Sequence, residues 1–184
     1  MIKLKEKIYD LKLLLAIIGF FLILLILSRL LVEVPNFTPT LSLVIFASLF
    51  IRNIYALIFI VIASQLISDY FLGFYESMFF VYISYILIGI YSLLFLKKVN
   101  YFPILKTSIG AAVFFYIITN FGVWFTMNLY EPDMQGLINS YIAGLPFLKS
   151  SILSTVIYSS TIYVFCKYLF VVNFEKIQTI KKID

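Results

Sequence analysis

Long apolar runs, separated by short polar or proline-containing connections, cover almost the whole of this 184-residue chain. A helix needs about 20 apolar residues to cross the hydrocarbon core of a bilayer, which is about 30 Å thick. The run at 41–51 has only about eleven residues, so it needs a thinned bilayer or burial by its neighbours. We predict an all-α integral membrane bundle with six transmembrane helices, at residues 11–31, 41–51, 54–72, 77–96, 107–128 and 149–172.

The composition agrees with a protein that lies within a bilayer. Hydrophobic residues make up 63% of the chain and charged residues 12%, whereas soluble proteins have about 25% charged residues. No polar stretch is long enough to fold alone, so residues 1–184 form a single transmembrane domain. The first apolar run is longer than the core of a signal peptide, about 7–15 residues, and is expected to stay as a helix.

The residue types present exclude several kinds of chemistry. The chain has no histidine and one cysteine, Cys166. Intrachain disulfides, thiolate zinc sites and histidine-based acid–base catalysis are therefore excluded. No phosphate-binding loop, metal-ligand spacing or catalytic triad is present. We predict no enzymatic activity, no cofactor and no metal.

The basic residues predict the orientation of the bundle. With six spans, all of the 14 Lys and Arg residues except Arg29 and Lys149 fall on the side of the two termini. Cytoplasmic loops of membrane proteins carry an excess of Lys and Arg, so both termini are expected in the cytoplasm of a multi-pass protein of the cell membrane. The same placement at helix ends argues against nucleic acid as a partner, despite the net charge of +5.

One segment is unlike an ordinary membrane anchor. Residues 118–150 contain the only tryptophan, two prolines and three glycines, between two apolar runs. A short interfacial helix is expected at 134–142, with Asp133 as its cap. We interpret the segment as the wall and lid of an outward-facing pocket for a small molecule.

Two polar residues are candidates for binding in that pocket. Asp69 shares a helix face with Gln65, and a carboxylate near the membrane usually faces protein, water or a partner. It is alternatively an interfacial residue that ends the third span near Gly73. Asn120 lies deeper, where its amide needs partners, and it binds either a ligand or a neighbouring helix.

Three further candidates lie close to these two in the expected topology. Trp124 follows Asn120 by one helical turn and either stacks on a planar ligand or belongs to the interfacial aromatic belt. Tyr141 has the same two interpretations. Asn36 lies between Pro35 and Pro39 in the first external connection, residues 32–40, where the two prolines favour a structured lid.

These residues also carry a resemblance. The chain resembles a bacterial family of uncharacterised six-helix membrane proteins, which in turn looks like the substrate-binding S components of energy-coupling factor vitamin transporters. The first resemblance extends over nearly the whole chain, and the second is an analogy of size, topology and hydropathy. The residues that carry the first are Asn36-Phe37-Thr38-Pro39, Ser68-Asp69 followed by Gly73, Thr119-Asn120-Phe121 with Trp124, Tyr130 through Gly136, Tyr141 and Pro146-Phe147.

The resemblance implies a binding protein without chemistry of its own. It would capture a vitamin-like compound outside the cell, with the first external loop and the outer ends of the later helices as its pocket. A transmembrane coupling subunit and cytosolic ATPases would then drive uptake. Two other classes remain as alternatives. One is a structural scaffold whose polar residues pack helices, and the other is a membrane enzyme or ion-coupled carrier centred on Asp69.

Overall fold

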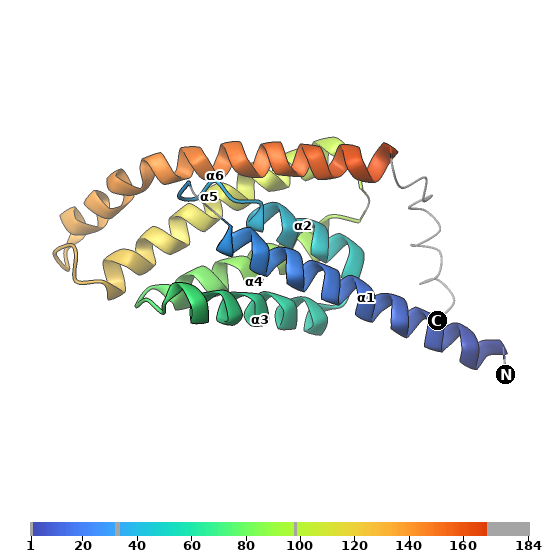
Figure 1. Ribbon diagram of the computed structural model, residues 1–184. Helices are drawn as coiled ribbons and strands as arrows, with labels where there is room; N and C mark the ends of the chain where they lie inside the picture. Colours follow the sequence, from blue (N-terminus) through green and yellow to red (C-terminus); the bar gives the residue numbers. More distant parts are fainter. Residues whose placement is uncertain (1, 32–33, 98, 169–184) are drawn as a thin grey trace.

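The protein is a bundle of six helices in the part of the chain that is described. The computed structural model describes residues 2–31, 34–97 and 99–168, and for residues 2–10 only the backbone. Residues 32–33 of the expected lid, the end of the last predicted span, and Lys98, Lys176, Lys181 and Lys182 lie outside these ranges. The helices are α1 (Ile2–Leu30), α2 (Thr40–Ile51), α3 (Ile54–Leu72), α4 (Met78–Phe95), α5 (Tyr101–Thr126) and α6 (Met134–Tyr168) (Figure 1).

Five of the six helices are long and apolar enough to cross a membrane, which confirms the all-α membrane fold. They are α3, α4, α5, the segment Leu11–Leu30 of α1 and the segment Met134–Lys167 of α6. The sixth, α2, has 12 residues and spans about 18 Å at 1.5 Å per residue. It therefore does not cross a bilayer of ordinary thickness by itself.

Helix α2 is instead the buried centre of the bundle. Ten of its residues are buried, and it contacts all five of the other helices. Val44, Ile45 and Phe46 are fully enclosed. Arg52 ends the helix with a φ of 49°, and Asn53 caps α3 by accepting a hydrogen bond from the amide of Ala56 at 3.0 Å. The predicted short run and the turn after it are both confirmed, and neighbouring helices provide the burial that a short helix requires.

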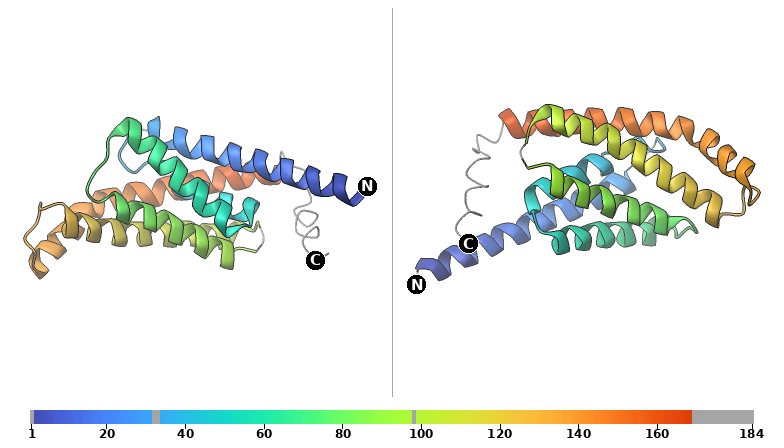
Figure 2. Two further views of the ribbon diagram at one scale, coloured as in Figure 1. Left: turned by 90° about the horizontal axis from the view of Figure 1, so that it is seen from below. Right: turned by 180° about the vertical axis from the view of Figure 1, so that it is seen from behind.

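Successive helices run in opposite directions along the bundle (Figures 1 and 2). The N-terminal end of α1 and the C-terminal end of α6 therefore lie at the same end. We call the opposite end, where α1, α3 and α5 finish and α4 and α6 begin, the site end. Helices α5 and α6 extend beyond the others there (Figure 1).

The last helix differs from the prediction. The interfacial helix expected at 134–142 and the span expected from 149 are one continuous helix, α6, with Pro146 inside it. A proline within a helix removes the hydrogen bond to the carbonyl four residues earlier and usually bends the helix rather than ending it. Figure 1 shows α6 curving in its first part, which contains Pro146, so the helix continues through the proline.

The contacts divide the bundle into two groups of helices. Helix α1 contacts only α2 and α3, whereas α6 contacts only α5 and α2. Helices α2 and α4 join the groups, because both also contact α5. Small side chains permit this close packing, and a Cβ atom on Gly89 of α4 would lie 3.1 Å from Leu57 and 3.3 Å from Val44. A seam between the groups therefore runs along α4 and α2.

Buried hydroxyl groups connect the two groups across this seam. Ser108 of α5 donates to Ser159 of α6 at 2.8 Å, and Ser159 donates to Ser42 of α2 at 3.0 Å. Ser42 in turn donates to the carbonyl of Thr155. In a membrane, small hydroxyl side chains of this kind hold helices together without exposing polar groups to lipid.

Candidate binding site

The connection between α1 and α2 ends in a well-defined turn. Asn36 has a left-handed φ of 57°, a conformation that asparagine adopts more readily than most residues. The amide of Phe37 donates to the carbonyl of Val34 at 3.1 Å, and the Thr38 hydroxyl accepts from the amide of Thr40 at 3.2 Å. Local hydrogen bonds therefore hold the described part of the predicted lid in one shape.

The same turn is attached to α6. The hydroxyl of Ser154 donates to the carbonyl of Asn36 at 3.2 Å, and the ring of Phe37 lies 6.0 Å from that of Tyr158. Thr40 also connects the turn to α1, because its hydroxyl lies 2.9 Å from that of Ser28. The turn thus bridges the first helix and the last.

Next to this turn lies a cavity of about 380 Å³. It is enclosed by the turn, the beginning of α4, the second half of α5, the α5–α6 connection and the first half of α6. Its volume falls near the lower limit of small-molecule pockets, about 300–1,000 Å³. The lining residues are Asn36, Ser77, Val81, Phe115, Tyr116, Thr119, Asn120, Val123, Met127, Leu129, Tyr130, Ser140, Ala143, Gly144, Phe147, Leu148 and Ser151.

Asn120 is held in the cavity wall by its own helix and by α6. Its Nδ2 donates to the carbonyl of Tyr116 at 2.8 Å, and its backbone carbonyl accepts from the hydroxyl of Ser140 at 3.2 Å. The amide lies directly against Gly144, where a Cβ atom would collide with Oδ1 of Asn120. Only glycine at position 144 leaves room for this amide.

Asp69 lies outside this cavity, in an ion pair whose carboxylate is fully buried. Its Oδ1 accepts from Arg29 of α1 at 2.5 Å, and its Oδ2 accepts from the hydroxyl of Tyr82 of α4 at 2.6 Å. Arg29 also donates to the carbonyl of Gln65 at 3.3 Å. Gln65, Ser68 and Asp69 are all fully buried, which confirms that they share one face of α3. The carboxylate connects α1, α3 and α4.

Tyr75, in the connection between α3 and α4, is a neighbour of this ion pair. Burial raises the pKa of its hydroxyl to about 12, and the nearby carboxylate of Asp69 acts in the same direction. Arg29 acts against that rise. The Tyr75 side chain therefore stays neutral at physiological pH, and the charges of Arg29 and Asp69 balance one another.

Trp124 binds the α5–α6 connection instead of the cavity. Its Nε1 donates to the carbonyl of Glu131 at 3.0 Å, and its ring lies 5.6 Å from that of Phe121. The same carbonyl lies so close to Gly136 that a Cβ atom there would collide with it. The carbonyl of Glu131 is thus held by the Trp124 side chain and packed against Gly136, which fixes this part of the connection.

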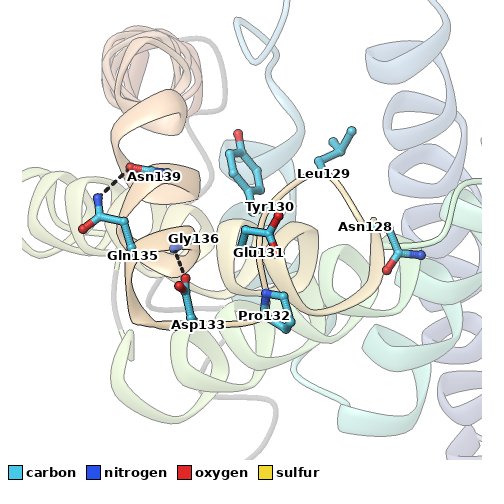
Figure 3. A pocket seen from close by; sticks show the side chains of 9 residues that line it. All are labelled: Asn128, Leu129, Tyr130, Glu131, Pro132, Asp133, Gln135, Gly136 and Asn139. Atoms are coloured by element: carbon cyan, nitrogen blue, oxygen red, sulfur yellow. Dashed lines mark hydrogen bonds between the residues drawn. The ribbon is translucent and has the colours of Figure 1, made fainter.

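The connection itself encloses a second, open hollow of about 460 Å³ (Figure 3). Asp133 caps α6 as predicted, with Oδ1 accepting from the amide of Gly136 at 2.7 Å. Nε2 of Gln135 donates to Asn139 at 3.1 Å along the same helix. Leu129 and Tyr130 line both this hollow and the inner cavity, so they lie between the two.

Tyr141 joins α5 to α6. Its hydroxyl donates to the carbonyl of Ile117 at 3.0 Å, and the hydroxyl of Tyr116 donates to the carbonyl of Tyr141 at 2.6 Å. These two reciprocal bonds fix the spacing of the helices beside the cavity. Tyr141 is therefore placed as a helix contact, and its neighbour Tyr116 is the one that lines the cavity.

The structure does not bring the five candidates together around one cavity. Asn36 and Asn120 line the same cavity, whereas Asp69, Trp124 and Tyr141 each bond to other parts of the protein. A helix fixes which of its residues share a face, but its rotation depends on packing. Sequence reasoning also missed Arg29 as the partner of Asp69, and Gly144 as the residue that accommodates Asn120. The sequence signal for Arg29 was a cation at the end of a predicted span, and that for Gly144 was a glycine two residues before Pro146.

The described residues place no three His, Cys, Asp or Glu side chains together as a metal site would require. Comparison with curated proteins and with solved structures found no significant match. Comparison with models of protein families found one, which covers residues 10–177 and is described as a family of unknown function. Because this match includes nearly the whole chain, the protein belongs to the DUF6580 family.

Proposed function

We propose that this multi-pass membrane protein binds a small, vitamin-like molecule in the cavity between the Asn36 turn and helices α4, α5 and α6. The observation that carries the proposal is the cavity itself, which is enclosed on several sides and lined by both polar and apolar side chains. Ligand pockets have this composition, with a mostly apolar wall and a few polar groups that orient the ligand.

The position of the cavity supports the same role. It lies at the site end of the bundle, between the first connection and the ends of the later helices. The substrate-binding S components that the chain resembles are expected to bind their ligands in the corresponding place. Of the predicted ligand-binding residues, Asn36 and Asn120 belong to the proposed site.

A binding measurement on purified protein in lipid nanodiscs tests the proposal. Compounds retained through purification are identified by mass spectrometry, and a panel of vitamin-sized compounds is screened by thermal shift. The variant Gly144→Ala places a methyl group against the Asn120 amide. The amide must then move from its position in the cavity wall, so the affinity for the ligand should fall about tenfold or more.

Gly110→Ala is the matched control. Both glycines lie within helices and gain similar helix propensity on substitution, but a Cβ atom at position 110 meets no atom within 4 Å. The control should bind like the wild type. If neither the wild type nor the control retains or binds any compound, the binding role is rejected and a structural scaffold is the better explanation.

We further propose that a separate coupling subunit and cytosolic ATPases supply the energy for uptake. The chain contains no phosphate-binding loop of its own. In liposomes, the protein alone should therefore bind the solute without accumulating it. Accumulation by the protein alone, abolished by Asp69→Asn, would instead identify an ion-coupled carrier. The contacts of Asp69 argue against that alternative, because both of its oxygens already have partners.

A further inference from the structure

The lining of the cavity indicates which class of molecule it accepts. Among the described residues that line it, none is Asp, Glu, Lys or Arg. Asp69, the carboxylate expected there, is fully buried elsewhere, in an ion pair with Arg29. A charged solute would therefore enter a partly buried cavity without a counter-charge in its wall, and an unpaired buried charge is strongly unfavourable.

Several polar side chains in the wall are nevertheless free to bind. Ser77 and Ser151 are 5% and 4% exposed, and neither hydroxyl has a hydrogen-bond partner within the described residues. The same holds for Oδ1 of Asn120, whose Nδ2 is already bonded to Tyr116. These groups come from the residue that precedes α4, from α5 and from α6. Buried hydroxyl and amide groups need partners, which a bound molecule would supply.

The remaining wall is apolar. Val81 of α4, Phe115 and Val123 of α5, and Phe147 of α6 all line the cavity. An apolar body would remove this surface from water, at about 25 cal/mol for each Å². The volume of about 380 Å³ restricts the ligand to a small molecule.

We infer that the ligand is an uncharged small molecule with an apolar ring or chain and hydrogen-bonding groups at its edge, and that Asn120 recognises one of those groups. This inference rests on the proposed function, because it describes the ligand of the same cavity. It differs from a pocket with a free Asp69 carboxylate in its wall, which would also admit a cation.

Matched compounds that differ only in charge test this inference. One series is nicotinamide, nicotinate and 1-methylnicotinamide, which are neutral, anionic and cationic versions of one ring. A second is benzamide, benzoate and benzamidine. Binding is measured by thermal shift and by isothermal titration calorimetry in nanodiscs of uncharged lipid. In any series that binds, the neutral member should bind at least about tenfold more tightly than either ion.

Substitution of Asn120 tests its role in the same assay. Asn120→Asp changes the amide into a carboxylate of nearly the same shape, and should shift the preference toward the cationic member. The matched control is Asn139→Asp on the outer hollow, which should leave the preference unchanged. Should Asn120→Asp fail to fold, Asn120→Ala with Asn139→Ala as its control measures the loss of neutral-ligand affinity.

The outcomes separate this inference from the proposed function. Tight binding of an ionic member, or an ionised compound retained by the wild type, would overturn the inference and leave the binding role intact. If Asn120→Ala and Asn139→Ala weaken the binding of neutral compounds equally, Asn120 is rejected as a recognition residue. If the wild type binds no member of either series and retains no compound, the proposed function fails, and the inference fails with it.

Discussion

At the scale of single residues, the most consequential contact is the ion pair of Arg29 and Asp69. The Asp69 side chain is fully buried and that of Arg29 is 14% exposed. Removing one partner of a buried pair leaves the other charge uncompensated, which typically costs about 3–5 kcal/mol. Replacing both partners with apolar residues is often much less harmful. The pair therefore connects α1 to α3. Removing one partner should destabilise the protein more than replacing both.

We expect Asp69→Asn to destabilise the protein by about 3 kcal/mol or more, because Arg29 would lose its counter-charge. Tyr82→Phe should have a smaller effect of about 1.5–3 kcal/mol, since it removes one hydrogen bond to a charged group. Unfolding monitored by circular dichroism in detergent measures both. The double variant Arg29→Met with Asp69→Leu should recover part of the loss. An unchanged stability of Asp69→Asn would contradict a structural role for the pair.

At the scale of helices, the bend in α6 brings its first half close to the cavity. Ala143, Gly144 and Phe147 line the cavity on either side of Pro146. Proline disfavours the interior of a helix by about 3 kcal/mol relative to alanine. Pro146 therefore lowers the stability of α6 at the point where the helix lines the proposed site. Replacing it should raise the stability of the protein and weaken ligand binding.

Pro146→Ala should raise the melting temperature or leave it unchanged, because the helix regains a backbone hydrogen bond and loses a steric conflict. It should also weaken ligand binding, because a straighter α6 moves Gly144 relative to Asn120. Thermal unfolding and calorimetric titration of the same preparation measure the two effects. A variant that gains stability and binds with unchanged affinity would show that the bend does not shape the cavity.

At the scale of the whole molecule, the alternating helices place one end of the bundle on each side of the membrane. Lys12, Arg52, Lys97, Lys106 and Lys167 lie toward the end that holds the start of α1. At the site end, the charge of Arg29 is balanced by Asp69, and Lys149, the other cation expected there, lies in the middle of α6. The positive-inside rule then predicts that the site end faces outward.

Labelling of single cysteines in intact cells tests this orientation. In a Cys166→Ser background, Asn128→Cys at the site end should react with a membrane-impermeant maleimide. Lys97→Cys at the opposite end should react only after the cells are opened. The reverse pattern would place the cavity on the cytoplasmic side and would contradict capture of a solute from outside.

Much of the fold was predictable because helices in a bilayer satisfy their own backbone hydrogen bonds. Apolar length and turn residues then locate the helices, as they did for α3 and for the short α2. The continuity of α6 through Pro146 was missed, because a local rule does not show whether packing will tolerate a proline inside a helix. The partner of Asp69 was missed because these helices are apolar nearly all round, and such helices do not indicate which face turns inward.

The sequence by itself therefore determined the membrane class, the positions of most helices and their alternating direction, since all three depend on local apolar length and on the connections. Only the tertiary structure decided that Asn36 and Asn120 share a cavity while Asp69 pairs with Arg29. The physical reason is that contacts between residues of different helices depend on how each helix is rotated about its axis. Close packing at residues such as Gly89 and Gly144 sets that rotation, and it involves residues far apart in the chain.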